Sequence, residues 1–416
     1  MHYQLSELPN GLRVITEAMP SVRSIALGLW IDTGTRDEFG SEAGASHFLE
    51  HLLFKGSDRY SARYIAETFD SIGAESNAFT SKDNTCFWGR LLDRDLPVGF
   101  DLLAEMLQLP AFRPNEIDSE RQVVIEEINM NEDDPSDLAF EEFSKAVFAG
   151  HPLASPVLGT RDSIRGMSRD DLAGYWGRRY GAGSTVVAMA GSIEHELAVE
   201  MASKLLGEWS GEAVDHRLEP SEPPPIVRLV PRETEQAHLV IGGAGIDRYD
   251  ERRFALDILN HILGGGMSSR LFLKIREERG LAYAVYSFRV AHADTGAWGV
   301  YVGTTPDQAD ICLGLIEEEI ATIIDDGITD EELERAKGSM RGGLALSMED
   351  PNSRMIRLGR DELAGAPHLS IDDRLARLEA VSPTEVQAIA RTLLKEGRVM
   401  GAVGPFKDGD LDRWVT

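Results

Sequence analysis

Cysteine is scarce in this sequence: the 416 residues include only Cys86 and Cys312. These two lie far apart, each within an apolar run, so neither a disulfide framework nor a cysteine-ligated metal site is predicted. Long hydrophobic runs are also missing, because no apolar segment approaches the roughly 20 residues that span a bilayer. The first residues contain no basic segment followed by an apolar one, as a signal or transit peptide would. These absences predict a soluble, cytoplasmic protein in a reducing compartment.

Basic residues are outnumbered. The chain has 42 Lys and Arg against 70 Asp and Glu, which gives a formal net charge of −28. Such a surface repels phosphate backbones, so nucleic acid is not an expected partner. It would attract basic peptides, although solubility alone is the commoner reason for an acidic surface. The balance of 42% hydrophobic and 27% charged residues predicts an ordinary globular protein, and the length predicts two or three domains.

Strand and helix patterns occur in the same order twice. In the first half, strands are expected at 11–16, 24–33, 75–80, 85–92 and 184–190, and helices from about residues 44, 62, 95, 115, 136, 170 and 194. A polar, proline-rich stretch at 212–225 then predicts a semi-rigid linker. In the second half, strands are expected at 226–229, 237–241, 284–290 and 299–303, and helices from about 251, from 268 and onward to the end.

Weak sequence matches, all in one order, indicate an internal duplication. At an offset of about 210, the matching pairs are His51/His261, Gly73/Gly280 and Trp88/Trp298. The expected domains are therefore 1–211 and 226–416, joined by the linker. Because both short turns and helices connect the strands, we expect an α+β fold, with a mixed α/β fold as the alternative. Each half would be a sandwich-like repeat, a largely antiparallel sheet with helices packed on it.

The segment His47-Phe48-Leu49-Glu50-His51 lies within a helical pattern. Histidines at i and i+4 share one helix face and can hold one metal ion, and Glu50 is one turn from His47. Two neutral imidazoles and a carboxylate base are the groups that metal-assisted hydrolysis needs. The alternative is a pair of helix histidines with ordinary partners, but the pattern would arise by chance only ~0.02 times in such a chain.

A third protein ligand is expected on the acid-rich helix at 116–131. Its candidates are Glu116, Glu120, Glu126 and Glu127. Glu120 and Glu127 are two helical turns apart and share a face with apolar neighbours, so one can bind metal while the other orients a ligand histidine. Glu126 points about 100° away and is expected in solvent. A solvated acidic face is the alternative.

The second half contains no complete copy of this site. At an offset of 210, the counterparts of His47, Glu50, His51 and Glu127 are Asp257, Asn260, His261 and Lys337. An amide cannot act as a base and a lysine ammonium cannot ligate a metal, so a metal ion is expected only in the first half. A glycine-rich loop at 263–270 occurs instead, and it favours mobility or close chain approach over phosphate binding.

On these residues the chain resembles the pitrilysin/insulinase family of zinc metallopeptidases, the inverzincins, and most closely the bacterial members similar to the mitochondrial processing peptidase. In that family a glutamate ligand follows the second histidine by about 76 residues, and another acid precedes this ligand by seven. Here 127 − 51 = 76 and 127 − 120 = 7. The family's Arg and Tyr, seven residues apart, match Arg276 and Tyr283. The resemblance covers nearly the whole chain.

The resemblance implies a zinc-dependent endopeptidase. One zinc ion per chain would be held by His47, His51 and Glu127, with Glu120 orienting a ligand histidine. Glu50 would be the general base for a zinc-bound water that attacks the scissile carbonyl. In the second half, Tyr283 would donate a hydrogen bond to the tetrahedral oxyanion, and Arg276 would hold substrate carbonyls.

The resemblance also implies how substrate is held. Paired α+β domains would form half of a clam-shell, and peptide would lie in the enclosed chamber as a strand added to a sheet edge. The matching edge is Ser76-Asn77-Ala78-Phe79-Thr80, with Asn77, Ala78 and Phe79 as its substrate-binding residues. Acids at the positions of Asp137 and Glu141 would contact an arginine near the cleavage site, which favours basic substrates. A solvated acidic helix start is the alternative for these two acids.

Relatives of this length commonly pair with a second subunit. Because the zinc motif and the Arg/Tyr pair are both intact, a homodimer of bacterial type is favoured over a heterodimer with a related subunit. The rival function is a non-catalytic scaffold or binding subunit of a processing-peptidase-like complex, whose zinc motif is usually damaged. A metal-dependent hydrolase of non-peptide substrates is a third interpretation, and the glycine-rich loop and candidate edge strand suit extended peptide chains better.

Overall fold

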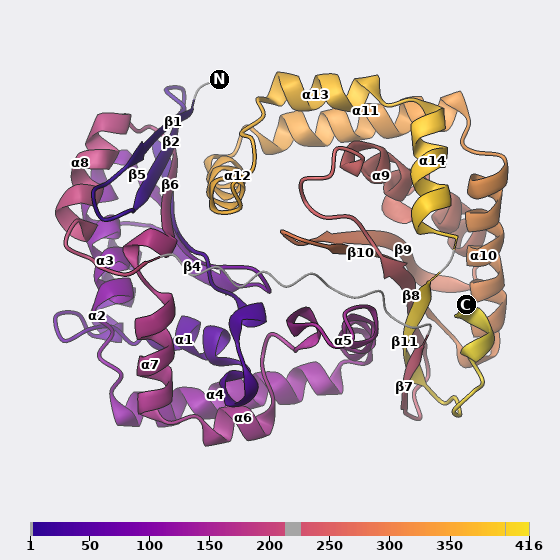
Figure 1. The fold of residues 1–416 in the computed structure, drawn as a ribbon, viewed down its shortest axis with the longest axis horizontal. Helices are drawn as coiled ribbons and strands as arrows, with labels where there is room; N and C mark the ends of the chain where they lie inside the picture. The colour runs from indigo at the N-terminus through magenta and orange to yellow at the C-terminus, as the bar shows by residue number, and fades with distance from the viewer. Residues whose placement is uncertain (1–2, 213–225, 396, 416) are drawn as a thin grey trace. The chain divides into compact units, whose positions relative to one another are not determined.

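The computed structural model describes residues 3–212, 226–395 and 397–415. All but the first residue of the predicted linker at 212–225 lies outside them. The described residues form two compact units, which Figure 1 draws as ribbons. The first unit comprises 3–128, 155–212 and 344–370; the second comprises 129–154, 226–343 and the described residues from 371 to 415. The predicted domain limits follow the order of the sequence and stay a prediction.

Six strands form the sheet of the first unit, in the order β1-β2-β6-β3-β5-β4. Their bounds are β1 (Tyr3–Glu7), β2 (Arg13–Ala18), β3 (Ser24–Ile31), β4 (Glu75–Thr80), β5 (Thr85–Leu92) and β6 (Thr185–Gly191). Only β2 and β6 run parallel, and every other neighbouring pair is antiparallel. Strand β4 therefore lies at an edge of the sheet and pairs with β5 alone.

Five strands form the sheet of the second unit, in the order β7-β11-β8-β10-β9. Their bounds are β7 (Val227–Pro231), β8 (Ala237–Ala244), β9 (Ala282–Ala291), β10 (Gly296–Thr304) and β11 (Arg398–Gly404). Here too a single pair, β7 with β11, is parallel. Apart from β1, the two sheets have the same order and the same strand directions, so the predicted α+β fold with two homologous repeats is confirmed.

Helices cover the sheets. Those of the first unit are α1 (Ala45–Leu53), α2 (Ala62–Ser71), α3 (Leu96–Gln108), α6 (Arg161–Gly166), α7 (Arg169–Arg179), α8 (His195–Leu206) and α12 (Pro351–Leu363). Those of the second are α5 (Pro135–Val147), α9 (Arg253–Asn260), α10 (Ala309–Asp325), α13 (Ile371–Ala380) and α14 (Pro383–Leu393). Helices α4 (Pro114–Asp133) and α11 (Asp330–Ser347) belong in part to each unit. No helix in the described part of the chain is long and apolar enough to cross a membrane.

Both faces of each sheet are buried, which explains why every residue of β6 and of β11 is buried. Successive strand residues point to opposite faces. Leu27 and Leu29 therefore join the core beneath α1, α3 and α8, while Trp30 packs against α12. In the second unit, α9, α10 and α14 cover one face and α5 covers the other.

The helices on the second faces, α12 and α5, come from the opposite half of the sequence. Both begin with an Asp N-cap followed by Pro, a strong start signal. Glycines let them lie close to the strands: a Cβ at Gly28 would be 2.3 Å from Met355 Sδ, and one at Gly401 would be 2.2 Å from the carbonyl oxygen of Ala139. Each repeat thus supplies a helix to the sheet of the other.

The prediction of helices to the end of the chain was wrong for one element. Strand β11 lies inside the second sheet, between β7 and β8. A strand buried on both faces shows no alternation of apolar and polar residues, so its short apolar run gave no period that distinguishes it from a helix. The duplication was the available signal, because 185–191 and 398–404 are the equivalent seven-residue segments of the two repeats and each is apolar after its first residue.

Candidate metal centre

Helix α1 carries three of the predicted site residues. Its core face, including Phe48, Leu49 and Leu52, is buried, while His47, Glu50 and His51 lie on the less buried side. This division follows from the 3.6-residue period of an amphipathic helix. The helix starts at Gly44, whose φ of +89° favours glycine, and which has no side chain to cap the free N–H groups.

Glu38 supplies the missing cap from outside the helix. Its carboxyl oxygens accept hydrogen bonds from the N–H groups of Gly44 and Ser46, at 2.6 and 2.7 Å. Burial raises the pKa of Glu38 to about 8, although these two bonds oppose the shift. Ser46 is also hydrogen-bonded through its hydroxyl to Tyr175, at 2.9 Å. The start of the motif helix is therefore anchored by buried polar groups that the sequence alone did not indicate.

Helix α4 carries the acidic candidates. Glu120 is 6% exposed and lies on the face with Ile117 and Val124. Glu127, two turns on, is partly exposed, and Glu126 is exposed, as expected from its angle. The burial of Glu120 agrees with the expectation that a carboxylate beside an apolar stripe has a specific partner.

Three candidate ligand atoms converge. Glu127 Oε2 lies 3.4 Å from His47 Nε2 and 3.6 Å from His51 Nε2. One ligand atom from each of these three residues lies within 4.8 Å of the other two. Two imidazole nitrogens and a carboxylate oxygen, with a fourth position open, form a donor set of catalytic zinc sites. The residues therefore fit a zinc ion.

Glu120 orients one of the histidines. His51 Nδ1 lies 3.1 Å from Glu120 Oε2, and the other oxygen of Glu120 pairs with Lys55 Nζ at 2.5 Å. A ligand histidine commonly donates its second N–H to a carboxylate, which leaves the other ring nitrogen free for the metal. The pairing of Lys55 with Glu120 was not predicted. It could have been, because Lys55 follows His51 by four residues and so lies on the same face of the helical pattern.

The lowered pKa of His47 suits a role as a metal ligand. Burial, with the neighbouring His51 as a smaller cause, lowers the pKa of His47 to about 4. The ring is therefore neutral near pH 7, as metal ligation requires. Its Nδ1 is buried and has no hydrogen-bond partner among the described residues. Within the described residues, the set of His47, His51 and Glu127 is the sole cluster with metal-ligand geometry.

Glu50 lies beside this cluster and is held by Thr80. The hydroxyl of Thr80 donates to Glu50 Oε2 at 2.6 Å, and both the hydroxyl and the backbone of Thr80 act to lower the pKa of Glu50. Burial raises the pKa of Glu50 despite these effects. A carboxylate with a raised pKa accepts a proton more readily, which suits a general base. Sequence reasoning placed Thr80 in the edge strand but missed this contact.

The predicted substrate-binding residues Asn77, Ala78 and Phe79 lie on β4, the edge strand. Ala78 donates its N–H to Oδ1 of Asn77 at 2.9 Å, not to the neighbouring strand. The ring of Phe79 packs edge-on against Trp30, with 5.4 Å between the ring centroids. An unpaired strand edge of this kind can accept a peptide as a further strand.

The other four candidates lie in the second unit. Arg276 stacks on the ring of Tyr283, with 4.7 Å from Cζ to the ring centroid, and Tyr283 is 78% exposed near the start of β9. On α5, Asp137 is exposed, and partial burial together with Asp134 raises the pKa of Asp137. Glu141 instead pairs with Lys145 at 2.6 Å. Of the two acids, Asp137 is the less neutralised.

At the equivalent positions of the second unit, the described residues have other partners. Asp257 pairs with Arg289, and Lys337 Nζ donates to the carbonyl oxygen of Glu379 at 2.8 Å. The glycine-rich segment 263–270 begins inside one π-helical segment, His261–Gly265, and ends shortly before another, Phe272–Glu277. A Cβ at Gly264 would be 2.3 Å from the backbone nitrogen of Ser287, which supports close chain approach as the reason for that glycine.

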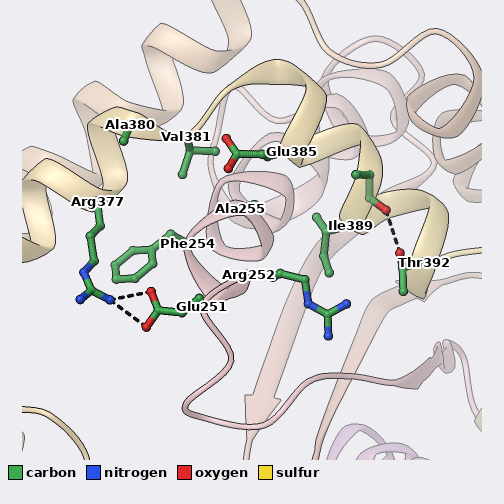
Figure 2. Close-up of a pocket in the computed structure, with 11 residues that line it drawn as sticks. Glu251, Arg252, Phe254, Ala255, Arg377, Ala380, Val381, Glu385, Ile389 and Thr392 are labelled. Carbon is green, nitrogen blue, oxygen red and sulfur yellow. Dashed lines mark hydrogen bonds and ion pairs between the residues drawn. The ribbon is translucent and has the colours of Figure 1, made fainter.

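The second unit also contains a pocket of about 470 Å³ between α9, α13 and α14 (Figure 2). Apolar side chains including Phe254 and Ile389 line it, and Arg377 and Glu251 pair at its rim, 2.6 Å apart. Arg252 is likewise paired, with Asp250, at 2.5 Å. Because its charged groups satisfy one another, the pocket gives no indication of a ligand.

Comparisons with known proteins place both halves of the chain in one family. Residues 13–161 match the family model described as "Insulinase (Peptidase family M16)", and residues 166–340 match "Peptidase M16 inactive domain". Proteins named "Uncharacterized zinc protease" from Streptomyces coelicolor and Bacillus subtilis are 41% and 40% identical. The first alignment covers 98% of this chain and 90% of the relative, and the second covers 95% and 97%.

Solved structures show the same fold. A peptidase M16 inactive domain from Pseudomonas fluorescens has a TM-score of 0.92 at 24% identity, with 98% of this chain and 99% of that chain covered. A protease from Helicobacter pylori has a TM-score of 0.92 at 20% identity, with 97% and 99% covered. At these identities the similarity supports the fold alone.

Proposed function

We propose that this chain, which belongs to the insulinase family of peptidases (peptidase family M16), is a zinc-dependent endopeptidase for basic peptides or unfolded segments. Its classification as a zinc metallopeptidase follows from the family and from relatives named zinc proteases. The observation that carries the finer proposal is the convergence of His47, His51 and Glu127 beside the carboxylate of Glu50. Cleavage within an enclosed chamber and one zinc ion per chain are parts of the same proposal.

The residues have distinct roles in this proposal. When bound by His47, His51 and Glu127, zinc supplies Lewis-acid polarisation and lowers the pKa of a water molecule. Glu50 takes the proton from the attacking water and delivers it to the nitrogen of the leaving amine. Glu120 keeps His51 in the orientation that binds metal. Tyr283 donates a hydrogen bond to the oxyanion, and Arg276 holds substrate carbonyls.

The name of the second family model does not favour a non-catalytic scaffold. The "inactive domain" match covers residues 166–340, whereas the metal cluster lies entirely within residues 13–161, which match the peptidase model. Since the zinc motif and the Arg276/Tyr283 pair are present in one chain, we further propose a self-sufficient homodimer over a heterodimer with a related subunit.

The preference for basic substrates can be tested on a peptide library. The purified protein should cleave such a library, lose this activity to a chelator and regain it with added zinc. Cleavage sites should be enriched in nearby arginine, because Asp137 presents an exposed carboxylate. In the Asp137→Asn/Glu141→Gln variant, kcat/KM for arginine-containing peptides should fall roughly 2- to 5-fold, the usual worth of an exposed ion pair, with apolar peptides unaffected.

A matched variant controls for net charge. Asp372 and Asp373 also lie at a helix start in the second unit, so Asp372→Asn/Asp373→Asn removes the same two charges and should leave the cleavage profile unchanged. If the Asp137/Glu141 variant treats arginine-containing and apolar peptides alike, the two acids are a solvated helix start and the specificity proposal fails.

Tyr283→Phe should lower kcat by about 10²- to 10³-fold, because it removes one donor that strengthens its hydrogen bond as the oxyanion forms. Zinc content and KM should change little. Tyr286→Phe is the matched control, since Tyr286 lies on the same strand and is also partly exposed. Steady-state kinetics on one peptide distinguish the outcomes: a higher KM with unchanged kcat would make Tyr283 a substrate-binding residue instead.

Mixing two inactive variants tests the homodimer. If Tyr283 acts on the zinc site of a partner subunit, mixed Glu50→Gln and Tyr283→Phe chains should recover part of the activity. Failure of rescue, once subunit exchange has been demonstrated, would assign Tyr283 to the zinc site of its own chain.

A further inference from the structure

Strand β4 ends at the proposed base. It pairs antiparallel with β5, and Thr80 is opposite Thr85. Beyond this rung, the N–H of Ser81 donates to the carbonyl oxygen of Asn84 at 2.8 Å. Backbone groups alternate along an antiparallel strand between the partner strand and the other side. The backbone groups of Asn77 and Phe79 therefore point to β5, as those of Ser81 do, and those of Ala78 and Thr80 point to the open edge.

A hydrogen bond outside the ladder agrees with this alternation, because the N–H of Ala78 donates to Oδ1 of Asn77. Two residues on, the hydroxyl of Thr80 donates to the carboxylate of Glu50. Thr80 is thus the place where the edge strand and the motif helix α1 meet through a hydrogen bond.

Thr80 holds Glu50 through its hydroxyl. The distance of 2.6 Å from Thr80 Oγ1 to Glu50 Oε2 is typical of a hydrogen bond from a hydroxyl to a charged carboxylate, which is stronger than one between neutral groups. A glutamate side chain with three rotatable bonds loses freedom when a hydroxyl binds its carboxylate. A base fixed in this way does not have to reorient when the substrate and water arrive.

We propose that Thr80 is a positioning residue that fixes Glu50 for proton transfer and ties it to the edge strand that receives substrate. The inference rests on the proposed role of Glu50 as the base.

The test is a set of Thr80 variants in the full chain loaded with zinc. Thr80→Val keeps the β-branched shape of the strand residue and replaces the hydroxyl with a methyl group. Its kcat should fall about 10- to 100-fold, the range expected when a hydrogen bond to a charged group is lost. KM and zinc content should stay as in the wild type. Thr80→Ala removes the same hydroxyl and should agree with Thr80→Val, whereas Thr80→Ser keeps it and should restore most of kcat.

Thr85→Val is the matched control. It makes the same substitution on the opposite rung, where the hydroxyl donates to the carbonyl oxygen of Thr33 at 2.9 Å and not to Glu50. This variant can lower the melting temperature but should keep kcat once folded. A normal kcat in both Thr80→Val and Thr80→Ala, an equal loss in Thr80→Ser, or an effect confined to KM would overturn the proposal.

A double-mutant cycle with Glu50→Gln separates this proposal from the proposed function. If Thr80 acts through Glu50, Thr80→Val should have little further effect on the residual activity of Glu50→Gln. An equal loss in both backgrounds would show that Thr80 acts through another group. Full activity of zinc-loaded Glu50→Gln would instead reject Glu50 as the base, whatever Thr80 does.

Discussion

Replacing Glu50 by Gln should remove nearly all hydrolysis while the metal stays bound. The amide keeps the shape of the side chain and can still accept the hydrogen bond from Thr80, which is 2.6 Å from the carboxylate in the native chain. It cannot accept a proton from water. Loss of a general base costs roughly 10²- to 10⁴-fold in rate.

The measurement combines kcat/KM on one peptide with metal analysis of the same sample. Glu126→Gln is the control, because Glu126 lies on the exposed side of α4 and undergoes the same change in charge and shape. It should behave as the wild type. Near-normal turnover by Glu50→Gln with a full complement of zinc would reject the assignment of Glu50 as base.

His51→Ala should reduce bound zinc from about one per chain to almost none, and activity with it. The substitution removes one of three ligands, and His51 is also the ligand that Glu120 orients, at 3.1 Å. Metal affinity in such sites depends on every ligand and on the groups that hold it. His261 cannot take the place of the lost ligand, because the second half of the chain has no metal cluster among the described residues.

His261→Ala is accordingly the matched control, since it alters the equivalent histidine of the second repeat. Zinc measured by elemental analysis after dialysis should stay at one per chain in this variant. Two tightly held zinc ions in the wild type, or unchanged zinc in His51→Ala, would contradict the site.

Much of the local structure could be predicted from the sequence because it depends on neighbouring residues. The strands expected at 75–80 and 85–92 occur with the predicted bounds as β4 and β5. The helix around His47 follows from the spacing of its apolar residues. The spacing of Glu120 and Glu127 placed both on one face of α4, where the structure has them directed at the histidines.

The contacts that complete the site could not be predicted, because they join segments that no local period connects. Thr80 reaches Glu50 across 30 residues. The cap on α1 comes from Glu38, in an irregular segment with no pattern of its own. Such partners depend on how a strand edge and a helix start pack against each other. The spacing of residues in the sequence contains no information about this packing.

By itself the sequence determined the duplication, the α+β class and which residues can ligate a metal, since these depend on residue types and on periods of two and 3.6. Only the tertiary structure decided which helix covers which sheet face. Both sheets are buried on two sides, and the covering helices α12 and α5 are supplied by the opposite halves of the sequence. The physical reason is that burying the second apolar face of a sheet is favourable whichever part of the chain supplies the covering helix, provided that the helix fits. Fit depends on close approach at Gly28 and Gly401, a property of packed surfaces and not of chain order.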